Sequence, residues 1–264
     1  MIAALPMYDW PEIRDATDAL WAALRPRLAA AGFAAPETLT RDRPPEAVWA
    51  DLDLLFAQTC GLPYVAGAAR PARIVATPDY AAEGCGAGRY SSALVVRRGE
   101  GAPALSGRRF AVNDFGSLSG WAAPLAKLGA AAIGETVLTG AHRASVLAVA
   151  EGRADAAAVD AVAWDLARRF EPSAEALEVV GWTDPAPAPP YVTSALTESG
   201  GRARLRAALV ETLVDAATAA IRAELRLTRI VAFADVDYDP ARKLAAGLRA
   251  AAGRTEADAA PAAG

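Results

Sequence analysis

The segment RRFAVNDFGSLSGWAAPLAKLG, residues 108–129, is the most informative part of the chain. Its apolar start predicts a short strand that runs directly into a helix start carrying Ser117, Ser119 and Gly120. A helix N-terminus offers unpaired backbone N–H groups and a partial positive charge, so hydroxyls and a glycine there suit an oxyanion. The pattern recurs in TGAHRASVLAVAEG (139–152), and RADAAAVDAVAWDLARRF (153–170) places an acid directly after an apolar strand. Together these segments predict one small anion held at the ends of several strands.

The whole chain alternates apolar strands with helices, which predicts an α/β protein with mainly parallel sheets flanked by helices and a ligand cleft at the carboxyl ends of the strands. Its 264 residues suit two lobes. We expect strands at 73–77, 90–97, 109–112, 156–159, 178–181, 191–193 and 230–233, and a long alanine-rich helix at 202–225. The run DPAPAPPY (184–191) reads as a return crossover between the lobes rather than a linker to a further domain. The predicted lobes are therefore 1–92 with 190–264, and 93–189.

Composition argues against several classes of protein. A net charge of −4 does not suit a nucleic-acid-binding protein, which needs a basic face. His142 is the single histidine, which excludes a site with several histidine ligands, and we expect no metal and no cofactor. No apolar run reaches the ~20 residues of a transmembrane helix. A GxSxG elbow, a P-loop and a GxGxxG turn after a strand are all missing from the sequence, so we expect a binding protein rather than an enzyme.

Six segments together resemble one known family. They are MYDW (7–10), QTCGLPY (58–64), TPDYAAEGC (77–85), NDFGSLSGWAAP (113–124), GAHRAS (140–145) and VDAVAW (159–164). In this order, over about residues 1–195, they look like the PhnD-like family, the phosphate/phosphonate substrate-binding components of ABC transporters. The resemblance implies the two-lobed type II periplasmic-binding-protein fold, closure on the ligand like a hinge, and a phosphate or phosphonate ligand. It also implies a permease and an ATPase as partners, and a monomer.

Each candidate site residue of the second lobe has a functional and a local interpretation. Ser117 and Ser119, with Gly120 allowing close approach, would contact the anion, or they are ordinary helix caps. The resemblance places His142 beside the phosphonate oxygens, whereas a lone histidine also occurs as a surface or capping residue. Asp160 either recognises a cationic or hydroxyl group of the ligand or caps the next helix.

Other residues are assigned by position. Tyr8, Thr59 and Tyr90 would contact the ligand from the first lobe, since they follow predicted strands or flank the crossover. Arg143 is disfavoured by the helix dipole at a helix start and is expected to point to solvent. We expect Trp121 and Trp164 to pack in the core or between the lobes.

Three alternatives stay open. Cys60 and Cys85 either form a disulfide, closing a loop of about 25 residues, or remain two thiols. The segment IAALPMY reads as the first strand with no leader before it, so the periplasmic location implied by the resemblance competes with a cytoplasmic one. A cytosolic enzyme of the same fold, acting on a carboxylate as in menaquinone synthesis, and a cytoplasmic anion sensor are the competing functions.

Overall fold

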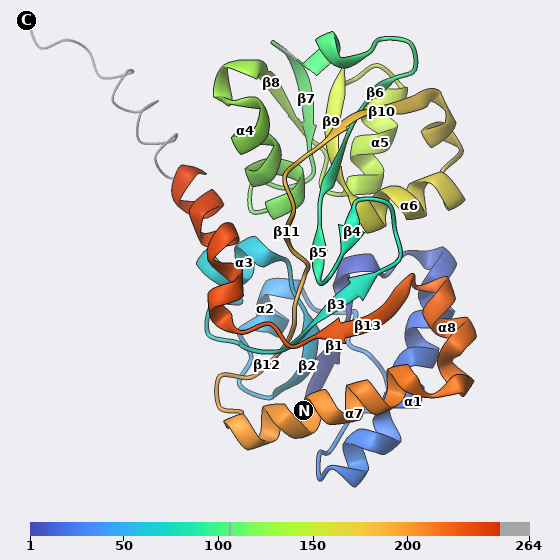
Figure 1. Ribbon diagram of the computed structural model, residues 1–264, viewed down its shortest axis with the longest axis vertical. Coiled ribbons are helices and arrows are strands. Elements are labelled where there is room, and N and C mark those ends of the chain that lie inside the picture. Colours follow the sequence, from blue (N-terminus) through green and yellow to red (C-terminus); the bar gives the residue numbers. More distant parts are fainter. Residues whose placement is uncertain (106, 249–264) are drawn as a thin grey trace, which may run out of the picture. The chain divides into compact units, whose positions relative to one another are not determined.

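The computed structural model describes residues 1–105 and 107–248 (Figure 1). The chain groups into two compact units: Met1–Tyr90 with Pro185–Tyr238, and Ser91–Asp184 with the segment from Asp239 onward. We expected that last segment to complete the first lobe, and part of it, 249–264, lies outside the described residues. Between β13 and residue 248 the described chain contains no strand, so a strand pattern carries no information on which unit this segment joins.

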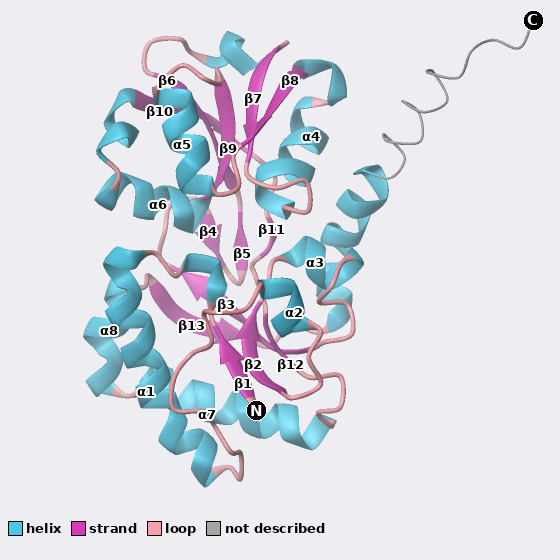
Figure 2. Ribbon diagram, turned by 180° about the vertical axis from the view of Figure 1, so that it is seen from behind, coloured by secondary structure: helices cyan, strands magenta, loops and turns pink. Residues whose placement is uncertain are grey.

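The first unit is built on a five-stranded sheet in the order β1-β2-β12-β3-β13. Its strands are β1 (Ile2–Ala4), β2 (Leu54–Gln58), β3 (Arg73–Tyr80), β12 (Tyr191–Thr193) and β13 (Leu227–Val231). Its helices are α1 (Arg14–Ala30), α2 (Pro45–Trp49), α3 (Gly61–Ala66), α7 (Ser199–Val214) and α8 (Ala219–Glu224). Helices α7 and α8 pack against the β3–β13 side of the sheet, and α2 packs against β2 (Figure 2). In α1, apolar residues at helical spacing (Leu20, Trp21, Leu24 and Leu28) are buried, which is why this segment is an amphipathic helix.

The alanine-rich segment near the C-terminus is two helices rather than the single predicted one. Helix α7 ends at Val214, and Asp215 accepts a hydrogen bond from the Ala217 amide at 2.9 Å. The same carboxylate pairs with Arg27 of α1. An aspartate that bonds its own following backbone competes with helix continuation, and here it starts a new turn.

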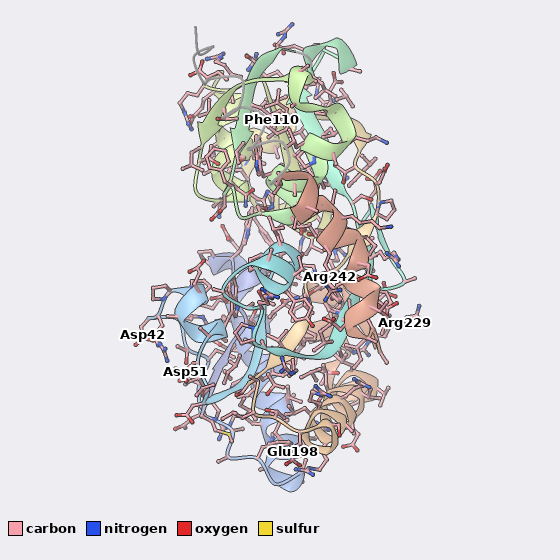
Figure 3. All side chains as sticks on the ribbon, turned by 90° about the vertical axis from the view of Figure 1, so that its left-hand side faces the viewer. Asp42, Asp51, Phe110, Glu198, Arg229 and Arg242 are labelled. Carbon is pink, nitrogen blue, oxygen red and sulfur yellow. The ribbon has the colours of Figure 1, made fainter. Side chains whose placement is uncertain are left out.

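The second unit holds another five-stranded sheet, in the order β10-β6-β9-β7-β8. Its strands are β6 (Ser92–Arg97), β7 (Arg108–Val112), β8 (Ile133–Leu138), β9 (Ala156–Asp160) and β10 (Leu177–Trp182). Its helices are α4 (Ala123–Leu128), α5 (His142–Ala150) and α6 (Ala161–Phe170). Leu94, Phe110 and Val112 belong to the core on the sheet, and Phe110 is labelled within this unit in Figure 3. A small sheet consists of β4 (Cys85–Gly86), β5 (Arg89–Tyr90) and β11 (Ala186–Pro187). Strands β5 and β11 lie next to the two points where the chain passes from one unit to the other, after Tyr90 and after Asp184.

The α/β class with mainly parallel sheets is confirmed, and each sheet also contains reversed strands. Strand β7 is parallel to β8 and β9, whereas β6 is antiparallel to β9 and β10. In the first unit β12 is likewise antiparallel to β2 and β3. Ser92, at the start of β6, pairs with Asp160, at the end of β9. The chain therefore enters this unit through β6, which begins at the edge of the sheet where β9 ends. Strand β6 for this reason runs antiparallel to β9.

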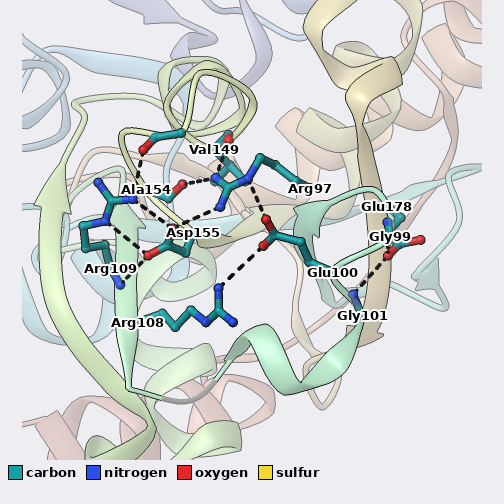
Figure 4. Close-up of polar contacts among 11 residues, drawn as sticks. Arg97, Gly99, Glu100, Gly101, Arg108, Arg109, Val149, Ala154, Asp155 and Glu178 are labelled. Carbon is teal, nitrogen blue, oxygen red and sulfur yellow. Dashed lines mark hydrogen bonds and ion pairs between the residues drawn. The ribbon is translucent and has the colours of Figure 1, made fainter.

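An ion-pair network fixes the amino end of β9 (Figure 4). The Asp155 carboxylate accepts hydrogen bonds from Arg109 (Nη2 at 2.9 Å and Nε at 3.2 Å) and from Arg97 Nη2 at 3.1 Å. Arg97 also donates to the carbonyls of Val149 and Ala154, at 3.0 and 2.8 Å. The network thus ties β6 and β7 to the end of α5, at the opposite end of β9 from Asp160.

Candidate functional site

Ser117 and Ser119 lie in a helix start that follows the carboxyl end of β7. Ser117 has an extended backbone and caps the π-helical turn Leu118–Ala122, and its Oγ accepts a hydrogen bond from the Gly120 amide at 3.0 Å. Ser119 Oγ lies 3.4 Å from Ser117 Oγ, and both side chains are buried. A π-helical turn is an uncommon geometry that occurs often at functional sites. The cap interpretation of Ser117 is confirmed, and its hydroxyl still has donor capacity left.

His142 is the first residue of α5 and contacts the other helix start. Before it, Gly140 turns the chain with φ +87°, a conformation that glycine adopts without strain. His142 Nε2 lies 2.9 Å from Ser119 Oγ. Two residues singled out from the sequence, 23 positions apart, therefore form a direct hydrogen bond between two helix starts.

The imidazole of His142 is neutral near pH 7. Burial lowers the pKa of His142 to about 4, and an interaction with the backbone of Ala158 offsets part of that effect. The residue as a whole is half-buried, but its Nδ1 is inaccessible to solvent and makes no well-aligned hydrogen bond. When Nε2 carries the proton, it donates to Ser119 Oγ, and the Ser119 Oγ–H is then the neutral donor that the pair offers to an added acceptor.

Gly120 is required by its neighbours. A Cβ atom at this position would collide with Asn113 Oδ1 and would lie 3.2 Å from His142 Cε1. Asn113 follows β7 directly, and its Oδ1 is buried with no hydrogen-bond partner among the described residues. Sequence reasoning missed Asn113, although it stands inside the motif that carries the family resemblance. The buried polar atom beside Gly120 and His142 was the signal that only the structure could supply.

Asp160 is held in place as a helix cap. Its Oδ1 accepts hydrogen bonds from the amides of Val162 and Ala163, at 2.8 and 3.1 Å, and the residue is 3% exposed. Ser92, its partner in the sheet register, donates from Oγ to the Ser119 carbonyl at 2.9 Å. The capping alternative is therefore confirmed. Asp160 ends β9, the strand next to β7, and β7 leads into the turn of residues 117–122, called the serine turn below. A role for Asp160 toward a ligand stays a prediction.

Two neighbouring contacts settle the start of α5. Thr139 Oγ1 lies 2.7 Å from Ser145 Oγ, and Ser145 is fully buried. The Ser145 hydroxyl therefore bonds within the start of α5 and does not reach solvent. The expectation that Arg143 points to solvent is wrong. Arg143 Nε donates to Glu171 Oε2 at 3.0 Å, because the start of α5 lies within reach of the residues that end α6.

Both tryptophans pack as expected. Trp121 contacts the core that contains Phe110, and Trp164 is 3% exposed.

In the first unit, polar and aromatic side chains gather where strands end. Tyr8, in a short turn after β1, meets the ring of Tyr80 edge-on with the ring centroids 5.5 Å apart. Gln58, the last residue of β2, donates to the Tyr80 hydroxyl at 2.9 Å. Thr59 follows directly and is fully buried. Sequence reasoning did not single out Tyr80 and Gln58, although both stand inside segments that carry the family resemblance.

Tyr90 and the two cysteines lie on the small sheet or close to β2. Tyr90 is 2% exposed in β5 and pairs with Cys85 and Ala186. Cys60 is buried and Cys85 is half-buried, and both are thiols in the structure rather than halves of a disulfide. Of the two alternatives, the structure has the second.

Two further findings concern the described part of the chain. Within residues 1–105 and 107–248, no group of three or more His, Cys, Asp or Glu side chains is arranged to hold a metal ion. Over the same residues, no helix combines the length and the apolar character needed to cross a membrane.

Several solved structures share this fold. XAC2383 from Xanthomonas citri bound to chloride superposes with a TM-score of 0.73 at 15% identity, covering 96% of this chain and 99% of that one. PhnD1 from Prochlorococcus marinus in complex with methylphosphonate gives 0.71 at 16% identity, covering 94% and 97%. A binding protein component of an ABC phosphonate transporter from Pseudomonas aeruginosa gives 0.70 at 19% identity, covering 94% and 86%. At these identities the likeness shows the fold, which is that of the type II periplasmic binding proteins.

The sequence comparisons are more specific about the family. A search of curated proteins gave no match. The model of one family, described as the ABC transporter, phosphonate, periplasmic substrate-binding protein, matches residues 51–238. This match covers well over half of the chain and includes the serine turn, His142 and Asp160. The chain therefore belongs to the family of periplasmic phosphonate substrate-binding proteins of ABC transporters.

Proposed function

We propose that this protein captures a small phosphorus oxyanion, phosphate or a phosphonate, by closure of its two units and delivers it to an ABC permease and its ATPase. The observation that carries the proposal is the 2.9 Å contact between Ser119 Oγ and His142 Nε2. It joins two helix starts, and in this proposal both starts would direct donors to one oxyanion. The family is one of transport components located in the periplasm, which supports a periplasmic site of action.

Neutral donors would hold the anion. Ser117, Ser119 and the backbone N–H groups at the two helix starts present hydroxyl and amide hydrogens, and His142 is uncharged near pH 7. Fixed dipoles of this kind bind an oxyanion without the strong charge of an arginine. Arg143 does not contribute, since Glu171 holds its guanidinium. The Asn113 amide, beside Gly120, supplies a further donor in this proposal.

Asp160 would then select the form of the ligand. A buried carboxylate close to an anion is repulsive unless the ligand carries a proton or a cationic substituent that the carboxylate can bind. Hydrogen phosphate, a singly protonated phosphonate and an aminoalkylphosphonate meet this requirement. Sulfate carries no proton at neutral pH and does not, so we expect the site to reject it.

The first unit would complete the enclosure with Tyr8, Thr59 and Tyr90. Tyr8 is already fixed against Tyr80 and offers its hydroxyl and ring at the strand ends. Two of the similar proteins bear on the choice of ligand. The Prochlorococcus protein was solved in complex with methylphosphonate, and the Pseudomonas protein is a component of an ABC phosphonate transporter. Both favour a phosphonate over phosphate as the ligand of this chain.

Thermal unfolding against a ligand panel tests the proposal. The panel contains methylphosphonate, 2-aminoethylphosphonate, phosphate and sulfate, and a ligand at 100 times its Kd adds about 2.7 kcal/mol to the stability of the folded state. We expect a phosphorus oxyanion to raise the midpoint and sulfate to leave it unchanged. At the same ligand concentration the shift should fall to about half or less in Ser119→Ala and persist in full in Ser199→Ala, an exposed serine at the start of α7. No shift with any phosphorus compound, or equal shifts in both variants, would refute the proposal.

A further inference from the structure

The first unit contains a second site that the proposed function does not use. A cavity of about 260 Å³ lies beside the edge strand β1, between the residues that follow it and the segment leading to α2. Its charged lining consists of Asp9, Arg14, Arg41 and Arg43. None of these residues belongs to the ligand site proposed above. Figure 3 labels two acids of this region. Asp42 precedes Arg43 in the sequence, and Asp51 forms an ion pair with Arg43.

The lining is rich in cations. Three arginines line the cavity, and Asp9 is the one acid among its lining residues. Arg41 holds Asp9 with two hydrogen bonds, of 2.6 and 3.0 Å, while Arg14 Nε is 3.6 Å from the same carboxylate. Two acids outside the lining complete the pairing, Asp18 at 2.8 Å from Arg41 and Asp51 at 2.9 Å from Arg43.

These pairs leave guanidinium hydrogens unused. Arg43 donates from Nη2 to Asp51 and, at 3.3 Å, to the Ala47 carbonyl, and its Nε and Nη1 have no acceptor among the described residues. Within that same part of the chain Arg41 Nη1 has none either, and Arg14 makes only its long contact with Asp9. Each arginine presents five donors in a planar fork that matches a carboxylate. The remaining donors are therefore available to an acid that enters the cavity.

The rest of the lining is mostly apolar. It includes Leu5, Leu39 and Val48, and Val48 belongs to the buried core of the unit. A wall of this kind takes the body of a small organic molecule, while the few polar groups fix its orientation. Inorganic anions would leave this apolar wall without a contact.

We propose that this cavity binds a small organic carboxylate. Its acid group would contact Arg14, Arg41 and Arg43, and its apolar body would pack on Leu5, Leu39 and Val48. The site belongs to the first unit alone, so it operates without the serine turn and His142. A carboxylate bound here provides this chain with a second ligand besides the oxyanion of the proposed function.

Calorimetric titration with benzoate tests the proposal. Benzoate combines the acid with an apolar ring, acetate has the acid alone, and benzamide has a ring without charge. We expect benzoate to bind, acetate to bind at least about tenfold more weakly, and benzamide not to bind, since charge-assisted hydrogen bonds carry much of the affinity. The double variant Arg14→Gln/Arg43→Gln should weaken benzoate by about tenfold or more. Arg70→Gln, an exposed arginine of the same unit outside the cavity, should bind like the unmodified chain.

The outcome also separates this site from the oxyanion site. Benzoate should bind equally to the unmodified chain and to Ser119→Ala, and methylphosphonate should not displace it. Displacement, or loss in Ser119→Ala, would place benzoate at the oxyanion site and overturn the proposal. Absence of benzoate binding, or binding that the double arginine variant leaves intact, would overturn it as well. Because none of these readouts needs a phosphorus ligand to bind, the inference can fail while the proposed function stands, and the reverse.

Discussion

Replacement of Asp155 by asparagine should destabilise the second unit. The carboxylate accepts hydrogen bonds from the guanidinium groups of Arg97 and Arg109 and from the backbone amide of Arg109. Asparagine is nearly the same size, but it has no charge, and one of its two oxygens becomes an NH₂ group. That group would face Arg97 or Arg109, which have no acceptor to offer it.

The expected cost is about 2 kcal/mol. A hydrogen bond to a charged group contributes about 1.5–3 kcal/mol, and the Asp155 side chain is only 13% exposed. Two factors reduce the sum over the four bonds. Arg109 is 41% exposed, so solvent screens its pairing, and the remaining amide oxygen of the variant still accepts one bond. A loss of about 2 kcal/mol corresponds to a decrease of about 4–8 °C in Tm for a chain of this size.

The effect should depend on pH in a defined direction. The hydrogen bonds from Arg109, with those from Arg97, hold the pKa of Asp155 well below its usual range. For an acid whose pKa is depressed on folding, the stabilisation is complete above the unfolded-state pKa of about 4 and is lost as the pH falls below it. The difference between the unmodified chain and Asp155→Asn should therefore be constant from about pH 5 to 8 and shrink below about pH 4.

Urea unfolding at several pH values measures this difference. Asp184→Asn provides a matched control, since Asp184 pairs with Lys127 but is 84% exposed, and we expect it to cost less than about 0.5 kcal/mol. Equal costs for the two substitutions at pH 7 would refute the reasoning. So would a cost for Asp155→Asn that stays the same at pH 3.5.

Three further predictions follow from the site. Gly120→Ala should abolish oxyanion binding measured by calorimetry, because the added methyl group meets Asn113 Oδ1; unchanged affinity would show that the turn is loose. Because burial lowers the pKa of His142 to about 4, the unfolded chain binds a proton that the folded chain does not as the pH falls from about 6.5 to 4. Folding stability should fall by about 2 kcal/mol over that range, and His142→Gln should lack this slope in urea titrations; an equal slope in the variant would contradict the assignment. Alkylation of the unfolded, unreduced chain should label both Cys60 and Cys85 by mass spectrometry, whereas a chain with no label would contain the disulfide.

Local signals explain most of what the sequence predicted correctly. The serine turn and the start of α5 were recognisable because a strand, a turn and a helix start follow each other over a few residues. The two starts were expected to hold one anion, but a direct contact between Ser119 and His142 was not expected, since residues 23 positions apart share no local pattern. The fate of Asp160 could not be decided in advance, because a cap and a ligand contact require the same residue at the same place.

The errors share a physical origin in contacts between distant segments. Strand β8 escaped notice because its side chains are half-exposed or exposed, so it shows no buried alternation. Asp215 ends α7 by accepting a hydrogen bond from the Ala217 amide, and it also pairs with Arg27 in α1, a contact between distant segments that the sequence does not show. Asn113 gave no signal beyond its place in a motif, because its significance lies in an oxygen buried against Gly120. Residues of this kind become visible only once the chain is folded.

The affinity of Ser119→Ala for methylphosphonate is the most direct test of the central claim that Ser119 and His142 hold a phosphorus oxyanion. Calorimetry of the unmodified chain, Ser119→Ala and the control Ser199→Ala gives three dissociation constants under one set of conditions. Loss of one charge-assisted hydrogen bond predicts about 10- to 100-fold weaker binding for Ser119→Ala and no change for Ser199→Ala. Tight binding of methylphosphonate that Ser119→Ala leaves unaltered would place the ligand elsewhere and contradict the account.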